Sequence, residues 1–70
     1  MTYTLTVVGQ DNREFASVED AISAGQASGE DVFAVSSVSD GLPTIHATGM
    51  LITYKQQNGR KGKMWNIAYI

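Results

Sequence analysis

The chain has 70 residues, a formal net charge of −2 and a 43% apolar share, which predict one compact domain over residues 1–70. It contains no cysteine, which excludes disulfides and thiolate metal sites and favours a reducing compartment. No apolar run approaches about 18 residues and the N-terminus lacks the features of a signal peptide. We therefore expect a soluble cytoplasmic protein with no membrane-spanning segment.

The charges are distributed unevenly along the sequence. Residues 1–40 carry all seven acidic residues and one cation, Arg13, for a net charge of −6. Residues 41–70 carry four cations and no acid, for a net charge of +4. Such asymmetry bears on partners rather than on the fold. It predicts either a polarised surface that attracts a charged partner, or two surfaces that neutralise each other in the folded molecule.

The first predicted element is a half-buried strand over residues 2–8. Polar and apolar residues alternate there, with the odd-numbered side chains facing inward. Turn-forming residues follow at 9–13. They lead either into a short hairpin strand at 14–16 or directly into a helix.

Ser17 opens the only predicted helix. Its hydroxyl can accept a hydrogen bond from an amide of the first turn, and Glu19 and Asp20 lie where the helix dipole favours negative charge. Apolar and small residues at i, i+3, i+4 and i+7 form one narrow stripe for burial: Val18, Ala21, Ile22 and Gly25. The helix is expected to end between Gln26 and Gly29.

The rest of the chain is predicted to form three strands. An apolar run interleaved with serines predicts a central strand over residues 31–39, and Pro43 places a turn at 40–44. Two long strands at 45–54 and 64–70 then flank Asn58-Gly59, a dipeptide typical of a two-residue hairpin turn. The predicted fold is α+β, in the order β-α-β-β-β, with a mainly antiparallel sheet and one helix packed on one face.

The turn type decides which residues of the hairpin face each other. A two-residue Asn58-Gly59 turn predicts the pairs Gln57–Arg60, Tyr54–Lys63, Ile52–Trp65, Met50–Ile67 and Thr48–Tyr69. A longer tip would change these partners. In either register both faces of the hairpin are apolar, and one short helix is available to cover them. The uncovered face is then an interaction surface, or the sheet twists to bury both sets of side chains in one core.

No constellation of catalytic or metal-binding residues is evident in the sequence. The single histidine, His46, lies within a predicted strand without a second ligand at metal-binding spacing. No serine lies in a strand–turn–helix elbow, and residues 59–63 lack the spacing and the following helix of a phosphate-binding loop. We therefore predict a protein that is not an enzyme and uses no cofactor or metal.

The predicted partner-binding site is the cationic tip of the hairpin. Its members are the cations, amides and aromatic residues near the turn: Lys55, Arg60, Lys61, Lys63, Gln57, Asn58, Tyr54 and Trp65. The cations can contact phosphates while a ring stacks on a base, or they can meet an acidic protein surface. They can also serve only to prevent edge-to-edge strand pairing. A pI of about 5.0 weighs against nucleic acid. Self-association into a homodimer through the uncovered sheet face is a further alternative.

A helix and an apolar strand precede the segments Tyr54-Lys55, Asn58-Gly59 and Lys63-Met64-Trp65. This arrangement resembles the C-terminal half of small phage-encoded anti-CRISPR proteins, which inhibit type I CRISPR–Cas complexes. The resemblance covers about a third of the chain, and the acidic first half lies outside it. It implies a stoichiometric inhibitor that docks on the nucleic-acid-binding subunits of a surveillance complex and blocks target DNA. The contacts it implies are Lys55, Arg60, Lys61 and Lys63.

Overall fold

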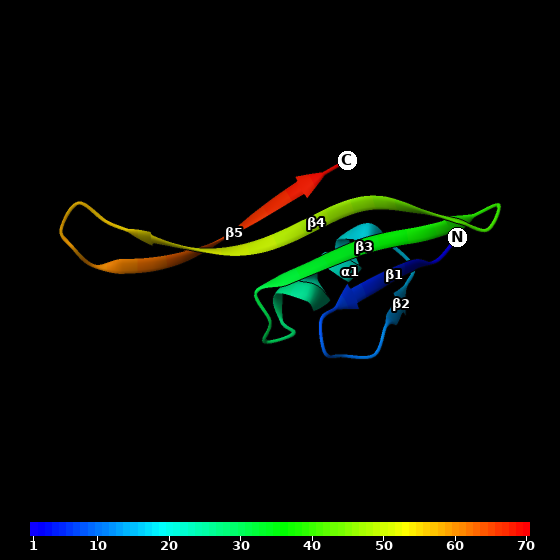
Figure 1. Cartoon of the computed structure of the whole chain (residues 1–70), viewed down its shortest axis with the longest axis horizontal. Helices are drawn as coiled ribbons and strands as arrows, with labels where there is room; N and C mark the ends of the chain where they lie inside the picture. The colour runs from blue at the N-terminus through cyan, green and yellow to red at the C-terminus, as the bar shows by residue number, and fades with distance from the viewer.

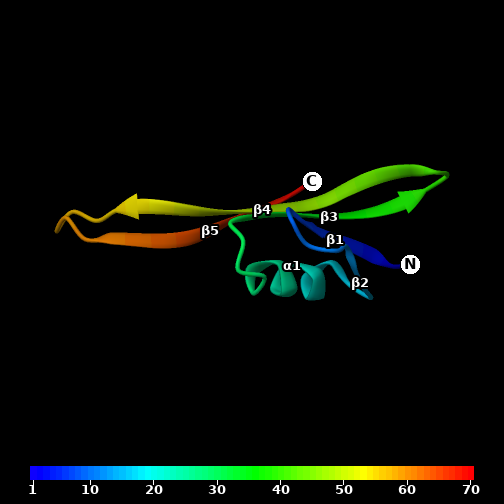
Figure 2. The ribbon, with the colours of Figure 1, turned by 60° about the horizontal axis from the view of Figure 1, so that its bottom comes forward.

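Five strands form one antiparallel sheet in the order β2-β1-β3-β4-β5, and one helix covers part of one face (Figure 1, Figure 2). The computed structural model describes residues 1–70. Its elements are β1 Tyr3–Val7, β2 Arg13–Phe15, α1 Val18–Gln26, β3 Val32–Ser39, β4 Leu42–Lys55 and β5 Lys61–Tyr69. The predicted α+β fold is confirmed. The short hairpin strand, left open by the sequence, forms as β2 and pairs with β1.

Helix α1 begins where its capping residue predicts. The Ser17 Oγ accepts a hydrogen bond of 3.1 Å from the Asp20 amide, and the helix ends at Gln26. Its buried residues are Ala21, Ile22 and Gly25, three members of the predicted stripe. The stripe packs on the sheet face formed by β1, β3 and β4.

The core lies between α1 and the sheet and centres on Phe33. A Cβ atom at Gly25 or at Gly49 would lie less than 3.0 Å from atoms of the Phe33 ring, which is closer than Cβ atoms pack in proteins. The two glycines therefore let the helix and β4 close around the ring from opposite sides. The apolar side chains buried with Phe33 are Leu5, Val7, Ala21, Ile22, Val35 and Ala47.

The predicted turn over residues 40–44 is too long. The structure turns on Asp40 and Gly41 alone, whose φ angles are +54° and +76°, and β4 already begins at Leu42. Two consecutive positive φ angles are those of a type I′ hairpin turn, which Asp-Gly favours. Pro43 is tolerated within the strand because β5 does not reach this part of β4, so its missing N–H breaks no β4–β5 hydrogen bond.

The predicted register of the terminal hairpin is wrong by one residue. Only Gly59 adopts a positive φ, of +85°, and its amide donates to the Gln56 carbonyl at 3.0 Å. The Gln56 amide in turn donates to the Arg60 carbonyl at 2.7 Å, which closes a three-residue loop over 57–59. Asn58 contributes through its side chain, whose Oδ1 accepts from the Arg60 amide at 2.9 Å. The extra loop residue makes Leu51, rather than Ile52, the partner of Trp65.

Candidate functional site

The β4–β5 hairpin extends well beyond the rest of the fold (Figure 1). The pairing of β4 with β3 ends at Met50, and the Leu51 amide donates one last hydrogen bond to the Asp31 carbonyl at 2.7 Å. From Ile52 to Met64 the two strands have only each other as neighbours. We call residues 52–64 the arm and the rest of the chain the body. The arm accounts for much of the molecule's length, which reaches 50 Å against widths of 22 and 17 Å.

One face of the arm carries three lysines, the lysine cluster: Lys55, Lys61 and Lys63. Lys55 lies directly opposite Lys61, and Lys63 lies opposite Thr53. Because side chains alternate along a strand, all three project from the same face. Like charges opposite each other on neighbouring strands destabilise a sheet. The cluster therefore concentrates positive charge at a small cost to the stability of the hairpin.

The opposite face of the arm is apolar and continues onto the body. Ile52 lies opposite Met64, and Val32 lies opposite Met50. With Tyr54 and Val8 these side chains form what we call the apolar stripe: Val8, Val32, Met50, Ile52, Tyr54 and Met64. All six are exposed, among them Met50 at 52% and Met64 at 53%. No element covers this face of the sheet, as Figure 2 shows. Its body end contains a shallow apolar depression of about 410 Å³, lined in part by Val8, Val32 and Met50.

The structure separates the residues that the sequence grouped at the tip. Gln57 and Asn58 form the tip loop with Arg60 beside them, and the lysine cluster lies just behind it. Tyr54 lies on the apolar face, where a Cβ at Gly62 would come within 2.7 Å of its ring. Trp65 lies at the base of the arm, half-buried, with its ring centroid 5.4 Å from that of Phe33. It thus packs against the body, and the exposed aromatic residue of the arm is Tyr54.

The sequence placed half of the apolar stripe correctly, because Met50, Ile52 and Tyr54 alternate along one predicted strand and share a face in either register. The tertiary structure adds Val8, which follows β1, and Val32 of β3, and the true register of the hairpin adds Met64 of β5. Gly59 at the third position of the loop is the sequence signal for a three-residue loop. That loop moves every partner on β5 by one position and places Met64 opposite Ile52.

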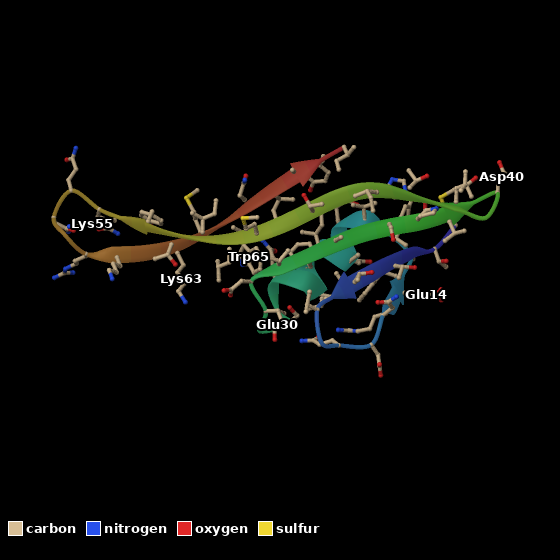
Figure 3. All side chains as sticks on the ribbon, viewed as in Figure 1. Glu14, Glu30, Asp40, Lys55, Lys63 and Trp65 are labelled. Atoms are coloured by element: carbon tan, nitrogen blue, oxygen red, sulfur yellow. The ribbon has the colours of Figure 1, made fainter.

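Charge is segregated along the long axis of the molecule. Lys55 lies near the tip of the arm, whereas Asp40 lies at the opposite end of the sheet (Figure 3). Glu14 and Glu30 lie on the body. The arm contains four cations and no acid, and the body contains the seven acids and Arg13. The fold therefore keeps the cations of the arm apart from the acidic side chains of the body, so the surface is polarised and the two groups of charges do not neutralise each other.

The single histidine is part of the structure of the body. His46 Nε2 and Ser37 Oγ share a hydrogen bond of 2.7 Å, and the His46 ring meets Tyr3 edge-on at 5.1 Å. The pair lies beside the bulge between β3 and β4, and the Ser37 side chain is only 4% exposed. The hydroxyl is thus satisfied within the fold and withdrawn from solvent. No group of three or more His, Asp or Glu side chains is arranged to hold a metal ion.

Helix α1, with nine residues, is too short to cross a bilayer, so the structure holds no membrane-spanning helix. No protein-family model, curated protein or solved structure matches the chain.

Proposed function

We propose that this chain is a non-enzymatic protein-binding inhibitor that docks through its arm on a larger protein complex and acts by occlusion. The observation that supports it most directly is the amphipathic arm, with the lysine cluster on one face and the apolar stripe on the other. The resemblance to anti-CRISPR proteins proposes the partner: a type I CRISPR–Cas surveillance complex whose binding to target DNA is blocked.

The arm is poorly explained as a device for stability. An isolated two-stranded hairpin is marginally stable in water at best, and this one places Lys55 directly opposite Lys61. It also leaves Ile52 and Met64 exposed, although a small domain needs its apolar residues in the core. These costs are recovered when a partner covers the arm. Exposed apolar surface beside concentrated charge is typical of interaction sites.

The chemistry of the two faces describes the partner surface. The lysine cluster fits an acidic surface, which sets the rate and orientation of association. Ile52, Tyr54 and Met64 fit an apolar pocket beside it, where burial supplies affinity. The partner surface is therefore a cleft with acidic residues on one wall and apolar residues on the other.

The test is a pull-down and titration with a purified type I surveillance complex. We expect Lys61→Glu to weaken binding at least about tenfold and Lys55→Glu/Lys61→Glu to abolish it, while the circular dichroism spectrum is unchanged. Arg13→Glu is the matched control, because it changes the net charge by the same amount on the body and is expected to alter affinity less than about twofold. Unchanged binding by the double variant would refute the docking site, and no binding by the wild-type chain would refute this partner.

A second candidate, a nucleic-acid-binding module, is favoured by one observation: the arm is a two-stranded ribbon, a shape that fits the major groove of B-DNA. Mobility shifts with duplex DNA and single-stranded RNA at low salt test it. If the lysine cluster contacts phosphates, affinity should fall by roughly one power of the salt concentration per contact. The absence of any shift would rule this candidate out.

A further inference from the structure

The two edges of the sheet differ sharply in how they are protected. At one edge, β2 has three residues, two of which, Arg13 and Glu14, are charged. At the other edge, β5 has nine residues and no neighbour on its outer side. Natural proteins keep edge strands short, charged or bulged, because an open edge pairs with other strands. The β2 edge follows this rule, and β5 breaks it over most of its length.

The pairing with β4 determines which groups of β5 are free. Gln56 donates to the Arg60 carbonyl at one end of the ladder, and Ile70 donates to the His46 carbonyl at 3.0 Å at the other. Hydrogen-bonded pairs recur at every second residue of an antiparallel ladder, so the even-numbered residues of β5 bond to β4. The odd-numbered residues therefore direct both N–H and C=O toward the open edge: Lys61, Lys63, Trp65, Ile67 and Tyr69.

Charge is present at only one end of this edge. Lys61 and Lys63 lie in the arm, whereas Met64 to Ile70 contain no charge and no proline, and the register with β4 continues without a bulge through Tyr69. Tyr69 itself is 65% exposed. The edge thus has a cationic half and an uncharged, aromatic half.

We propose that β5 pairs with the β5 of a second copy of this chain, antiparallel and centred on Trp65. In this register each outward-directed residue meets an outward-directed residue: Lys63 lies beside Ile67 of the other copy, and Lys61 beside Tyr69. Each lysine is then placed against the uncharged half of the partner strand, and Lys61 can rest on the Tyr69 ring. A parallel in-register alignment would place each lysine beside the same lysine of the other copy, and like charges at that distance disfavour it. The edge is therefore complementary to itself in one orientation.

The dimer also removes the weaknesses of the isolated arm. In each copy the stretch 61–64 gains residues 66–69 of the partner as a third strand, the minimum for a stable sheet. The cationic arm of one copy lies along the body of the other, whose residues 1–40 carry a net charge of −6. The pairing uses backbone groups at the edge of β5, so the tip loops and the two faces of the arm stay open, and the dimer does not depend on the proposed function.

Sedimentation equilibrium on the wild-type chain, from micromolar to millimolar concentration, tests the dimer. We expect a mass of twice the 7.5 kDa of one chain at the upper end of the range. Hydrogen exchange measured by NMR should show the amides of Lys63, Trp65 and Ile67 protected in the dimer and exchanging freely on dilution. A monomer throughout the range would overturn the proposal, as would a dimer in which these three amides remain unprotected.

Proline variants at the open edge locate the contact. In Tyr69→Pro and Lys63→Pro the lost N–H points outward, so no hydrogen bond to β4 is removed and the circular dichroism spectrum should be retained. Both variants are expected to be monomeric. Met50→Lys, on the apolar stripe, is the control against face-to-face packing and should remain dimeric. A dimer that survives both prolines but is lost in Met50→Lys would overturn the edge pairing.

Discussion

In the body, the strands β1 and β3 have neighbours on both edges and a helix over one face, whereas in the arm β4 and β5 have only each other. The body buries Phe33 between two glycines, and its one buried polar side chain, Ser37, is paired with His46. The arm leaves Ile52 and Met64 exposed and sets Lys55 opposite Lys61. One sheet thus contains a closely packed region and an exposed two-stranded region, and substitutions in the two should have different consequences.

The largest difference is expected for truncation of an apolar side chain. Phe33→Ala should cost about 3–5 kcal/mol, since it empties the centre of the core, and unfold much of a domain this small. Ile52→Ala in the arm should cost less than about 1 kcal/mol, because this side chain is already exposed. Urea unfolding followed by Trp65 fluorescence measures both. Equal losses would mean that the arm belongs to the cooperative core.

Two glycine substitutions make the same comparison by adding a methyl group. Gly49→Ala drives a Cβ into the Phe33 ring, which is fixed in the core, and should cost about 1–3 kcal/mol. Gly62→Ala meets the far end of the exposed Tyr54 side chain, which can move aside, so we expect a change within about 0.5 kcal/mol. Thermal unfolding of the two variants tests this. A large loss in Gly62→Ala would show that the Tyr54 ring is held in place.

The hydrogen bond between Ser37 and His46 should stabilise the body measurably. His46→Ala leaves the buried Ser37 hydroxyl without its partner and is expected to cost about 1–3 kcal/mol. Adding Ser37→Ala should restore part of that loss, because no buried polar group then remains unpaired. A double-mutant cycle in urea measures the coupling. Simple additivity of the two losses would contradict the pairing.

The smallest effect is expected from the lysine cluster. Lys55→Thr removes the like-charge pair with Lys61 and should raise stability by a few tenths of a kcal/mol at low salt, with the gain disappearing at high salt. Precise urea midpoints at two salt concentrations are the measurement. Lys63→Thr, which lies opposite Thr53, is the matched control and should show a smaller gain. A loss of stability in Lys55→Thr would indicate a structural role for this lysine.

Local sequence patterns predicted the elements of this fold well. Alternation predicted β1, the serine cap and its stripe predicted α1, and the apolar runs predicted β3 and the two hairpin strands. Each of these signals is contained within a short window, because burial of one face imposes its period on neighbouring residues. The cationic character of the arm was evident for the same reason, as its charges are close in sequence.

The turns were harder to predict, although both contain a favourable dipeptide. Asp40-Gly41 forms the two-residue turn that was expected of Asn58-Gly59, and the latter lies in a three-residue loop. An Asn-Gly or Asp-Gly pair is compatible with either loop length. The choice depends on the strands beyond the turn, which must each present the correct face to the core.

The sequence by itself determined the identity and order of the elements other than β2, the uneven distribution of charge along the chain and the lack of a disulfide, since these follow from local composition and spacing. Only the tertiary structure decided the register. The Phe33 ring of β3 occupies the space over Gly49 of β4 and so meets the Trp65 ring of β5, and this contact is made in the register that pairs Trp65 with Leu51. This register places the three lysines on one face of the arm and the apolar side chains on the other. A shift of one residue would move every side chain of β5 to the opposite face relative to its partners on β4.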